Sequence, residues 1–546
     1  EYLIVFASGK DRPNRFSSPH TNFKISSDGE TLVLTDPDGA LCDSVYTKIE
    51  STDISMGRMT GTGEEWFLFL EPTPGEINAV DGYQDYSNAV VEMSIPGGFY
   101  DSNITLDLST ISENAEIRYT VDGSEPTQSS ILYTSAVSID TTTVVRARIF
   151  EGNMFLGSIN TQTYFIDVAK NLPVISLSTD PDNYFDDDIG IYVEGIDKSF
   201  VYYNYKQDWE RPVHIELYET NGSRGFSIDC GVKISGFMIR DHAQKPFALF
   251  ARPKYGYSKI DYQIFPDLPI TEFKSITLRN GGNEFYAVGL TRFRDSLCHS
   301  LVKNTNIDIM AFSPAKVFLN GVYWGHYNIR EKQNEDYLAS HHNIDPETVD
   351  MLEFTAGPDL KPFLSVIEGD SLHYKAMEHY IVNNDMSDPA NYEYIKTQMD
   401  IENFIDYNIA EMYLANVNWS AHNVKFWRPR TPNGKWRWIL CDLDWGLTYP
   451  EAKMFEPSSD SKIFFGEQYM ALLFNLLDNK EFKYNLLNRF GDYINTIFSP
   501  DIVIQRMNEI KALLEPGMQN HITRWKDREI VLNEKIESMD DWNSSI

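Results

Sequence analysis

Short runs of alternating apolar and polar residues open the chain and predict β-strands. Residues 32–34 and 41–45 read as two strands, and the Asp-Pro-Asp-Gly sequence at 36–39 reads as the turn between them. Similar runs at 115–120 and 144–149 predict further short strands. The first third of the chain is therefore expected to be all-β.

The pattern changes to mixed strand and helix from about residue 174. Apolar residues recur at helical spacing over 401–419, with Asp400 as the N-cap, and the pattern beyond residue 465 is again helical. We therefore expect an α+β domain with a helical C-terminal part after the β-rich segments.

Residues 418–445 predict a β-hairpin. The segments 424–428 and 436–440 are β-branched and aromatic, and the turn between them contains Asn433-Gly434. If the turn centres on that pair, paired residue numbers sum to about 867. Asn423 is then opposite Asp444 at the base of the hairpin.

A cluster of oxygen donors is expected at that base. Asp442 and Asp444 are two residues apart on an extended segment, so both carboxylates point to one side, close to Asn423. Hard divalent cations favour such ligands. The alternative is that the Asp-Leu-Asp sequence only caps a strand and binds backbone amides.

Composition and charge narrow the class of protein. The 546 residues are 42% hydrophobic and 13% aromatic, which indicates packed domains, and the net charge of −33 argues against a nucleic-acid partner. The sequence contains no apolar run long enough to span a membrane. Four cysteines without Cys-x-x-Cys spacing predict buried free thiols, not a zinc site or disulfide scaffold.

The hairpin and three earlier segments resemble one family. The order of an Asn-containing loop, a hairpin and an Asp is that of a kinase catalytic core. Together with residues 233–252, 276–295 and 318–338, it resembles the CotH kinase family, named for spore-coat protein H. The resemblance implies an atypical kinase-like fold over residues 174–546, with a core at 174–450 and a helical part at 451–546.

The same resemblance implies ATP with Mg²⁺, or Mn²⁺ or Ca²⁺, as cofactors. Asn423 and Asp442 would hold the metal, with Asp444 as a further ligand or a supporting residue. Lys245, a lone Lys in an apolar segment, would pair with Glu331 and align the nucleotide phosphates. The alternative is a surface Lys and an unrelated Glu.

Two arginines are further candidates for phosphate contacts. Arg240 lies in the turn before Lys245, where the family usually has a Ser in the preceding position and this chain has Ile239. Arg294 is a candidate phosphate-side Arg, although a helix-surface salt bridge with Asp295 explains it as well. The polar turn at 279–283 is a weaker candidate for an anion site.

Asn418 departs from the family pattern. That position usually carries an Asp, which by analogy orients and deprotonates the acceptor hydroxyl, whereas an Asn can orient but cannot take the proton. Loss of a general base typically costs about 10²–10⁴-fold in rate. His422 is a nearby substitute. The aromatic residues of the hairpin are expected to be core.

Two accessory modules precede the kinase-like domain. Residues 1–80 resemble the later part of a lamin-tail domain, an immunoglobulin-like β-sandwich whose first strands are absent, so we expect the native chain to begin upstream. Residues 86–168, with Thr-Val-Asp-Gly-Ser-Glu-Pro-Thr, resemble the β-sandwich at the C-terminal side of chitobiases and hexosaminidases.

Two functions remain open. One is an extracytoplasmic kinase that transfers phosphate to Ser, Thr or another hydroxyl of a protein or glycan acceptor. The other is a non-catalytic pseudokinase of the bacterial cell surface that binds protein or polysaccharide. Similarity to the two accessory modules implies a secreted or surface-attached protein.

Overall fold

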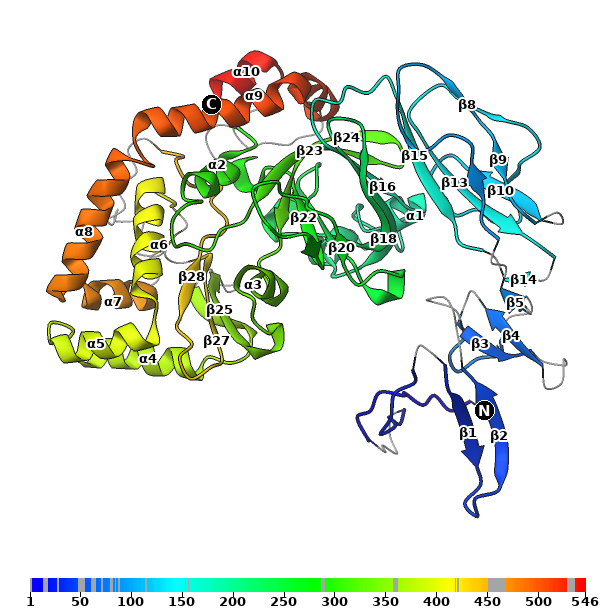
Figure 1. The fold of residues 1–546 in the computed structure, drawn as a ribbon, viewed down its shortest axis with the longest axis horizontal. Coiled ribbons are helices and arrows are strands. Elements are labelled where there is room, and N and C mark those ends of the chain that lie inside the picture. The colour runs from blue at the N-terminus through cyan, green and yellow to red at the C-terminus, as the bar shows by residue number, and fades with distance from the viewer. Residues whose placement is uncertain are drawn as a thin grey trace.

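The computed structural model places four parts in chain order: N-terminal strand pairs, a sandwich module, a barrel and a helical part (Figure 1). The structure describes residues 2–12, 18–26, 29–47, 55–59, 65–69, 72–78, 82–83, 85–86, 89–112, 115–152, 154–155, 157–285, 290–356, 362–417, 419, 422–449, 467–527 and 536–546.

The N-terminal residues form small separate sheets. β1 (Thr31–Thr35) pairs with β2 (Leu41–Tyr46), and β3 (Ser55–Arg58) pairs with β4 (Trp66–Phe69), each pair antiparallel. β5 (Asp85–Tyr86) pairs with β14 (Met154–Phe155). The expected strands at 32–34 and 41–45 are confirmed, while the likeness to a lamin-tail domain stays a prediction.

The sandwich module is built on a five-stranded sheet in the order β11-β10-β13-β15-β7. One face of its central strands is apolar and packs on the core of the module, whereas the opposite face carries arginines and threonines. Its strands are β6 (Glu92–Met93), β7 (Gly98–Tyr100), β8 (Ile104–Leu106), β9 (Leu108–Ser109), β10 (Glu116–Thr120), β11 (Ile131–Leu132), β12 (Val137–Ile139), β13 (Thr143–Phe150) and β15 (Asn160–Ile166).

The part that is expected to be kinase-like begins with a closed seven-stranded barrel in the order β16-β17-β18-β19-β22-β24-β23. Apolar side chains that alternate along the strands fill it, which is why these strands are so rich in Val, Ile, Leu and Phe. Its strands are β16 (Val174–Ser178), β17 (Arg211–Tyr218), β18 (Arg224–Ile234), β19 (Phe247–Phe250), β22 (Ser275–Arg279), β23 (Phe312–Leu319) and β24 (Val322–Glu331). The short β20 (Ile260–Asp261) and β21 (Glu272–Phe273) form a ribbon beside it, and α1 (Pro181–Phe185) follows β16.

The second half of this part combines a four-stranded antiparallel sheet with helices. The sheet order is β26-β25-β27-β28, and a large apolar core joins it to the helices. The elements are α2 (Arg294–Leu301), α3 (Glu335–His342), β25 (Val349–Ala356), β26 (Pro362–Glu368), α4 (Leu372–Asn383), α5 (Pro389–Gln398), α6 (Ile401–Leu414), β27 (Val424–Pro429), β28 (Arg437–Ile439), α7 (Glu467–Leu476), α8 (Lys480–Asn495), α9 (Pro500–Trp525) and α10 (Met539–Ser544).

Local signals explain where α6 begins and ends. The Asp400 side chain accepts from the Asn403 N–H at 3.1 Å, so the expected N-cap is confirmed. The helix ends at Leu414, earlier than the expected residue 419, because Ala415 adopts a left-handed conformation with φ of 50°. The chain then turns towards the loop before β27.

The sandwich module packs directly on the barrel. Phe165 of β15 lies edge-on to Tyr218 and Phe318, with ring centroids 5.4 and 5.1 Å away. The hydroxyls of Thr163 and Ser176 are 2.7 Å apart in the same buried contact. The module is therefore fixed to the barrel strands β16, β17 and β23.

Candidate functional site

The β27–β28 hairpin has a different register from the expected one. Lys425 pairs with Ile439, so paired numbers sum to 864 and Asn423 lies opposite Cys441. The expected pairing of Asn423 with Asp444 is wrong. Asn423 and Asp442 both have left-handed backbone, with φ of 60° and 52°. Asn and Asp tolerate this conformation better than other non-glycine residues do.

Contacts outside the hairpin end the β27–β28 pairing at Trp427 and Arg437. Trp436 forms a bridge with Met399, and its amide donates to the Gln398 carbonyl at 3.0 Å and not to Arg428. Arg428 pairs with Asp350 of β25 on the other edge of β27. The connection between the strands is consequently wider than a two-residue turn.

Four side chains meet at the base of the hairpin, and we call them the acid–arginine cluster: Arg279, Asn423, Asp442 and Asp444. The Arg279 guanidinium donates to Asp442 Oδ1 and, at 2.5 Å, to Asp444 Oδ2. The Asn423 amide donates to Asp442 Oδ2 at 2.8 Å. The structure thus brings together the three oxygen-donor residues that the sequence indicated.

Asp444 is the buried member of the cluster. Its side chain is fully buried, and it accepts from the Asn283 N–H at 2.7 Å. A Cβ on Gly282 would come within 2.0 Å of its Oδ2, so only glycine permits this approach. Burial raises the pKa of Asp444 well above its usual range, and the Arg279 guanidinium opposes the rise.

A second ion pair lies next to the acid–arginine cluster and holds its backbone in place. Arg330 of β24 donates to Asp295 of α2, and both are almost fully buried. Asp295 also accepts from the Leu443 N–H at 2.9 Å, which fixes the backbone between the two cluster carboxylates. Burial lowers the pKa of Arg279, but the surrounding carboxylates, Asp444 foremost, raise it well above its usual value.

The donor set fits a hard divalent cation. Asp295, Asp442 and Asp444 face two guanidiniums, those of Arg279 and Arg330. Asp444 Oδ1 is buried and has no hydrogen-bond partner in the described residues. No group of three or more acidic, histidine or cysteine side chains suited to a metal occurs within the described ranges. A metal here would therefore use the amide oxygen of Asn423 beside the two carboxylates.

Lys245 lies elsewhere. Its ammonium donates to the carbonyls of Arg240 and His242 at 2.6 and 3.1 Å and lies 3.6 Å from the centre of the Tyr205 ring. It lines a cavity of about 550 Å³ whose lining contains no member of the acid–arginine cluster. Burial lowers the pKa of Lys245 to about 8.

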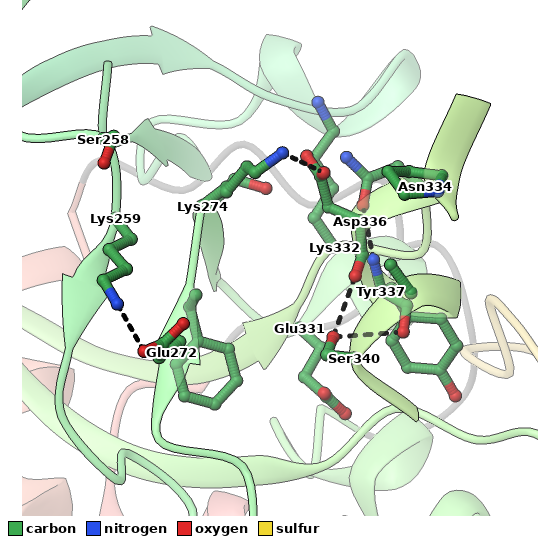
Figure 2. A pocket seen from close by; sticks show the side chains of 14 residues that line it. Ser258, Lys259, Glu272, Lys274, Glu331, Lys332, Asn334, Asp336, Tyr337 and Ser340 are labelled. Atoms are coloured by element: carbon green, nitrogen blue, oxygen red, sulfur yellow. Dashed lines mark hydrogen bonds and ion pairs between the residues drawn. The ribbon is translucent and has the colours of Figure 1, made fainter. Parts of the chain in front are cut away.

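Glu331 has other partners than Lys245. Its carboxylate accepts from the Ala311 N–H at 2.9 Å and contacts His341 Nε2 at 2.6 Å. It lines a cavity of about 400 Å³ on the side of Tyr337, across from the Lys259–Glu272 pair (Figure 2). The expected ion pair between Lys245 and Glu331 is therefore wrong.

Strand order explains why the pair does not form. Lys245 precedes β19, Glu331 ends β24, and β22 lies between these two strands in the barrel. The alternation of a strand also places Arg279 on the outer face of β22, since its neighbour Leu278 belongs to the barrel core. The outer face of β22 is the one that meets the hairpin.

The two candidate arginines differ in position. Arg240 donates to the Lys206 carbonyl at 2.9 Å, and no hydrogen bond or ion pair joins it to the cluster in the described part of the chain. Arg294 is buried, not part of a helix-surface salt bridge, and donates to the Asp444 carbonyl and the Thr448 hydroxyl, each at 3.2 Å. Arg294 thus supports the backbone of the cluster.

The loop before β27 is described in part. Asn418 lies outside the described residues, and its expected role stays a prediction. His422 is half-buried, and burial lowers its pKa. The sequence reading missed Glu411, a fully buried acid near the end of α6 that accepts from Asn416 at 3.1 Å. Burial raises the pKa of Glu411 to about 8.

The aromatic residues of the hairpin are core, as expected. Trp427, Trp436 and Trp438 are at most 2% exposed. The cysteines in the described ranges are free, and all but Cys42 are buried. Among the helices that the structure describes, none is both long and apolar enough to cross a membrane.

The comparisons with known proteins identify the family. The family model "CotH kinase protein" matches residues 232–545, more than half of the chain, and the chain belongs to this family of atypical kinase-like proteins. The "Chitobiase/beta-hexosaminidase C-terminal domain" model matches residues 95–161, which lie in the sandwich module. No curated protein matches the chain. The expected resemblances to the CotH kinase family and to the chitobiase and hexosaminidase module are confirmed, whereas no family model here shows the lamin-tail resemblance.

Proposed function

We propose that the acid–arginine cluster is a binding site for ATP and a divalent metal in an extracytoplasmic kinase-like protein. The observation that carries this proposal is the meeting of Asn423, Asp442 and Asp444 at the base of the hairpin. In protein kinases an Asn and an Asp in this order hold Mg²⁺ between the nucleotide phosphates. Bound metal would neutralise phosphate charge.

In this proposal Arg279, and not Lys245, is the cation that contacts the nucleotide phosphates. Kinases pair a strand Lys with an acid of the following helix, next to the metal-binding Asp. Here β22 ends in Arg279, and α2, the next α-helix, carries Asp295, whose charge helps to raise the pKa of that arginine. Arg279 would bind phosphate oxygens once a metal shares its carboxylates.

Nucleotide binding is tested by thermal unfolding of the full chain with Mg²⁺, with ATP and with both. A ligand at a free concentration of about 100 times its Kd stabilises the folded protein by about 2.7 kcal/mol. We expect a rise in Tm with ATP and Mg²⁺ together, lost in Asp442→Asn and kept in the exposed control Asp385→Asn. No shift under any condition would end the nucleotide proposal.

Phosphoryl transfer depends on the acceptor side, where Asn418 replaces the usual Asp. Positioning and charge neutralisation supply most of the catalysis in such reactions. If the base is the missing element, Asn418→Asp raises transfer to a Ser, Thr or glycan hydroxyl, measured with labelled ATP. An unchanged, undetectable rate in a variant that still binds ATP favours the second candidate, a surface pseudokinase.

A further inference from the structure

A cavity of about 750 Å³ lies where the sandwich module meets the barrel, far along the chain from the acid–arginine cluster. One wall comes from β13 and the start of β15, and the other from β16, β17, β18 and the segment after β19. Ligand sites occur preferentially at such junctions between domains. The residue composition of the walls indicates what would bind.

Two neighbouring arginines of β13 line this junction cavity. Arg146 and Arg148 are two residues apart and so lie on the same face of the strand. Arg146 donates to the Gly123 carbonyl at 2.7 Å and is 3.9 Å from Glu125. Arg148 has no hydrogen bond or ion pair among the described residues, and burial lowers its pKa.

Further polar atoms of the lining lack partners. Nε of Arg146, Nε of Arg148 and Oγ of Ser178 are all buried without a hydrogen bond in the described part of the chain. Buried polar groups of this kind are normally satisfied. A paired guanidinium fork binds the two oxygens of a carboxylate or phosphate. The arginine pair therefore favours a ligand with an oxyanion.

The rest of the lining suits a ligand with many hydroxyls. Glu125 and Asp229 offer acceptors, Ser158 and Thr161 offer hydroxyls, and Tyr257 contributes an aromatic ring that is 44% exposed. Such mixed donors and acceptors beside a ring match the alternating polar and apolar faces of a sugar.

The charge of the whole chain limits the size of the ligand. A net charge of −33 repels a long polyanion, whereas a single oxyanion can enter a pocket that carries its own guanidiniums. We propose that the junction cavity binds a saccharide that carries one oxyanion, either the carboxylate of a uronic acid or the phosphate of a sugar phosphate. This proposal is independent of the nucleotide site.

The test is calorimetric titration of the full chain with glucuronate, galacturonate, glucose 6-phosphate, glucose and inorganic phosphate. At least one of the acidic sugars should bind about tenfold more tightly than both glucose and phosphate. Preference between uronate and sugar phosphate identifies the source of the oxyanion. Binding should weaken as the salt concentration rises.

Two variants and a matched control locate the site. Arg148→Gln should weaken acidic-sugar binding about tenfold. Tyr257→Ala, at an exposed position, should weaken it as well without affecting folding. Arg118→Gln should leave it unchanged, because Arg118 is opposite Arg148 on the same sheet face but donates to Ser130 and Glu116 outside the cavity. The proposal is overturned if none of the acidic sugars binds at millimolar concentration, if free phosphate binds equally well, or if both cavity variants bind like the parent.

Discussion

Arg279 is the residue on which the two halves of the kinase-like part meet. It comes from the outer face of a barrel strand and holds two carboxylates that follow the hairpin strand β28. Its positive charge lies between the carboxylates of Asp442 and Asp444. In the proposed function, a metal and this guanidinium would compete for the same oxygens, and a nucleotide would relieve the competition by offering phosphate to the arginine.

This competition predicts how two cation-removing variants differ. Arg279→Met leaves two carboxylates without their guanidinium, which costs about 3–5 kcal/mol of stability. Mg²⁺ alone should then stabilise this variant more than Mg²⁺ stabilises the parent. The added effect of ATP should be lost. Lys245→Met should respond to Mg²⁺ and ATP as the parent does, since Lys245 lines a different cavity.

Thermal unfolding of both variants, with Mg²⁺ and with Mg²⁺ and ATP, is the measurement. The opposite result, in which Lys245→Met loses the response to ATP and Arg279→Met keeps it, would restore Lys245 as the phosphate-side cation.

Glu411 predicts a dependence of stability on pH. Its pKa rises from 4.5 to about 8 because it is buried, so the folded protein holds the proton more tightly than the unfolded chain does. The contribution of Glu411 to the free energy of unfolding is fully present below about pH 4.5. It is lost as the pH rises towards 8, by up to about 1.4 kcal/mol per pH unit.

Glu411→Gln removes that dependence because an amide does not titrate. Relative to the parent, the variant should gain stability steadily between pH 5 and pH 8 in chemical unfolding experiments. Glu402→Gln, at a largely exposed position of the same helix, is the control and should show no such gain. Equal pH profiles for Glu411→Gln and the parent would contradict the burial argument.

The residues at the site were only partly predictable from the sequence. Asn423, Asp442 and Asp444 could be found because a hairpin brings nearby positions together. Arg279 could not be assigned, because its contact joins residues more than 160 positions apart and depends on which strand neighbours which. The one available signal was an arginine at the end of an apolar strand, followed by a glycine turn.

At the scale of elements, the turn after β22 decides how closely the barrel approaches the hairpin. Gly282 has φ of 65°, and its missing Cβ leaves the space that Asp444 Oδ2 fills. Strand content and the start of α6 could be predicted from periodicity and capping. The register of β27–β28 could not, because the pairing ends at Trp427 and Arg437 and leaves a connection longer than the expected Asn433-Gly434 turn.

Gly282→Ala should therefore disturb the site as well as the backbone. Gly256→Ala is the matched control, because Gly256 also has positive φ, at 91°, but no atom within 4 Å of the added methyl. Both variants should lose about 1–2 kcal/mol from left-handed backbone. Only Gly282→Ala should also lose the stabilisation by Mg²⁺ and ATP, as measured by thermal unfolding. Equal responses of the two variants to ligand would show that the close approach is unimportant.

At the scale of the whole molecule, α9 joins the two cores of the kinase-like part. Ile510, Leu514 and Met518 belong to the core of the helical part, whereas Trp525 belongs to the core of the barrel. The Trp525 indole donates to the Trp324 carbonyl at 2.9 Å. The sequence indicated a helix here, but not that it would span both cores, since the partners are about 200 residues away.

Trp525→Ala should separate the unfolding of the two cores. Removal of a buried Trp costs about 3–5 kcal/mol, and here the loss falls on the connection between the cores. Calorimetry of Trp525→Ala should then resolve two unfolding transitions, one for each core. In the parent, the two cores should unfold in a more strongly coupled way. Leu513→Ala, at a position of the same helix that is 49% exposed, should change little. A single unfolding transition in Trp525→Ala, with a loss of stability smaller than about 3–5 kcal/mol, would show that α9 does not couple the cores.

We propose that a metal and a nucleotide share the base of the β27–β28 hairpin. The most direct measurement is a crystal structure of the full chain with Mn²⁺ and a non-hydrolysable ATP analogue, with the metal located by its anomalous scattering. We predict an anomalous peak coordinated by Asp442 and Asn423 or Asp444, with phosphate oxygens near Arg279. A bound nucleotide and metal in any other cavity, with the Arg279 pairs intact, would contradict this account.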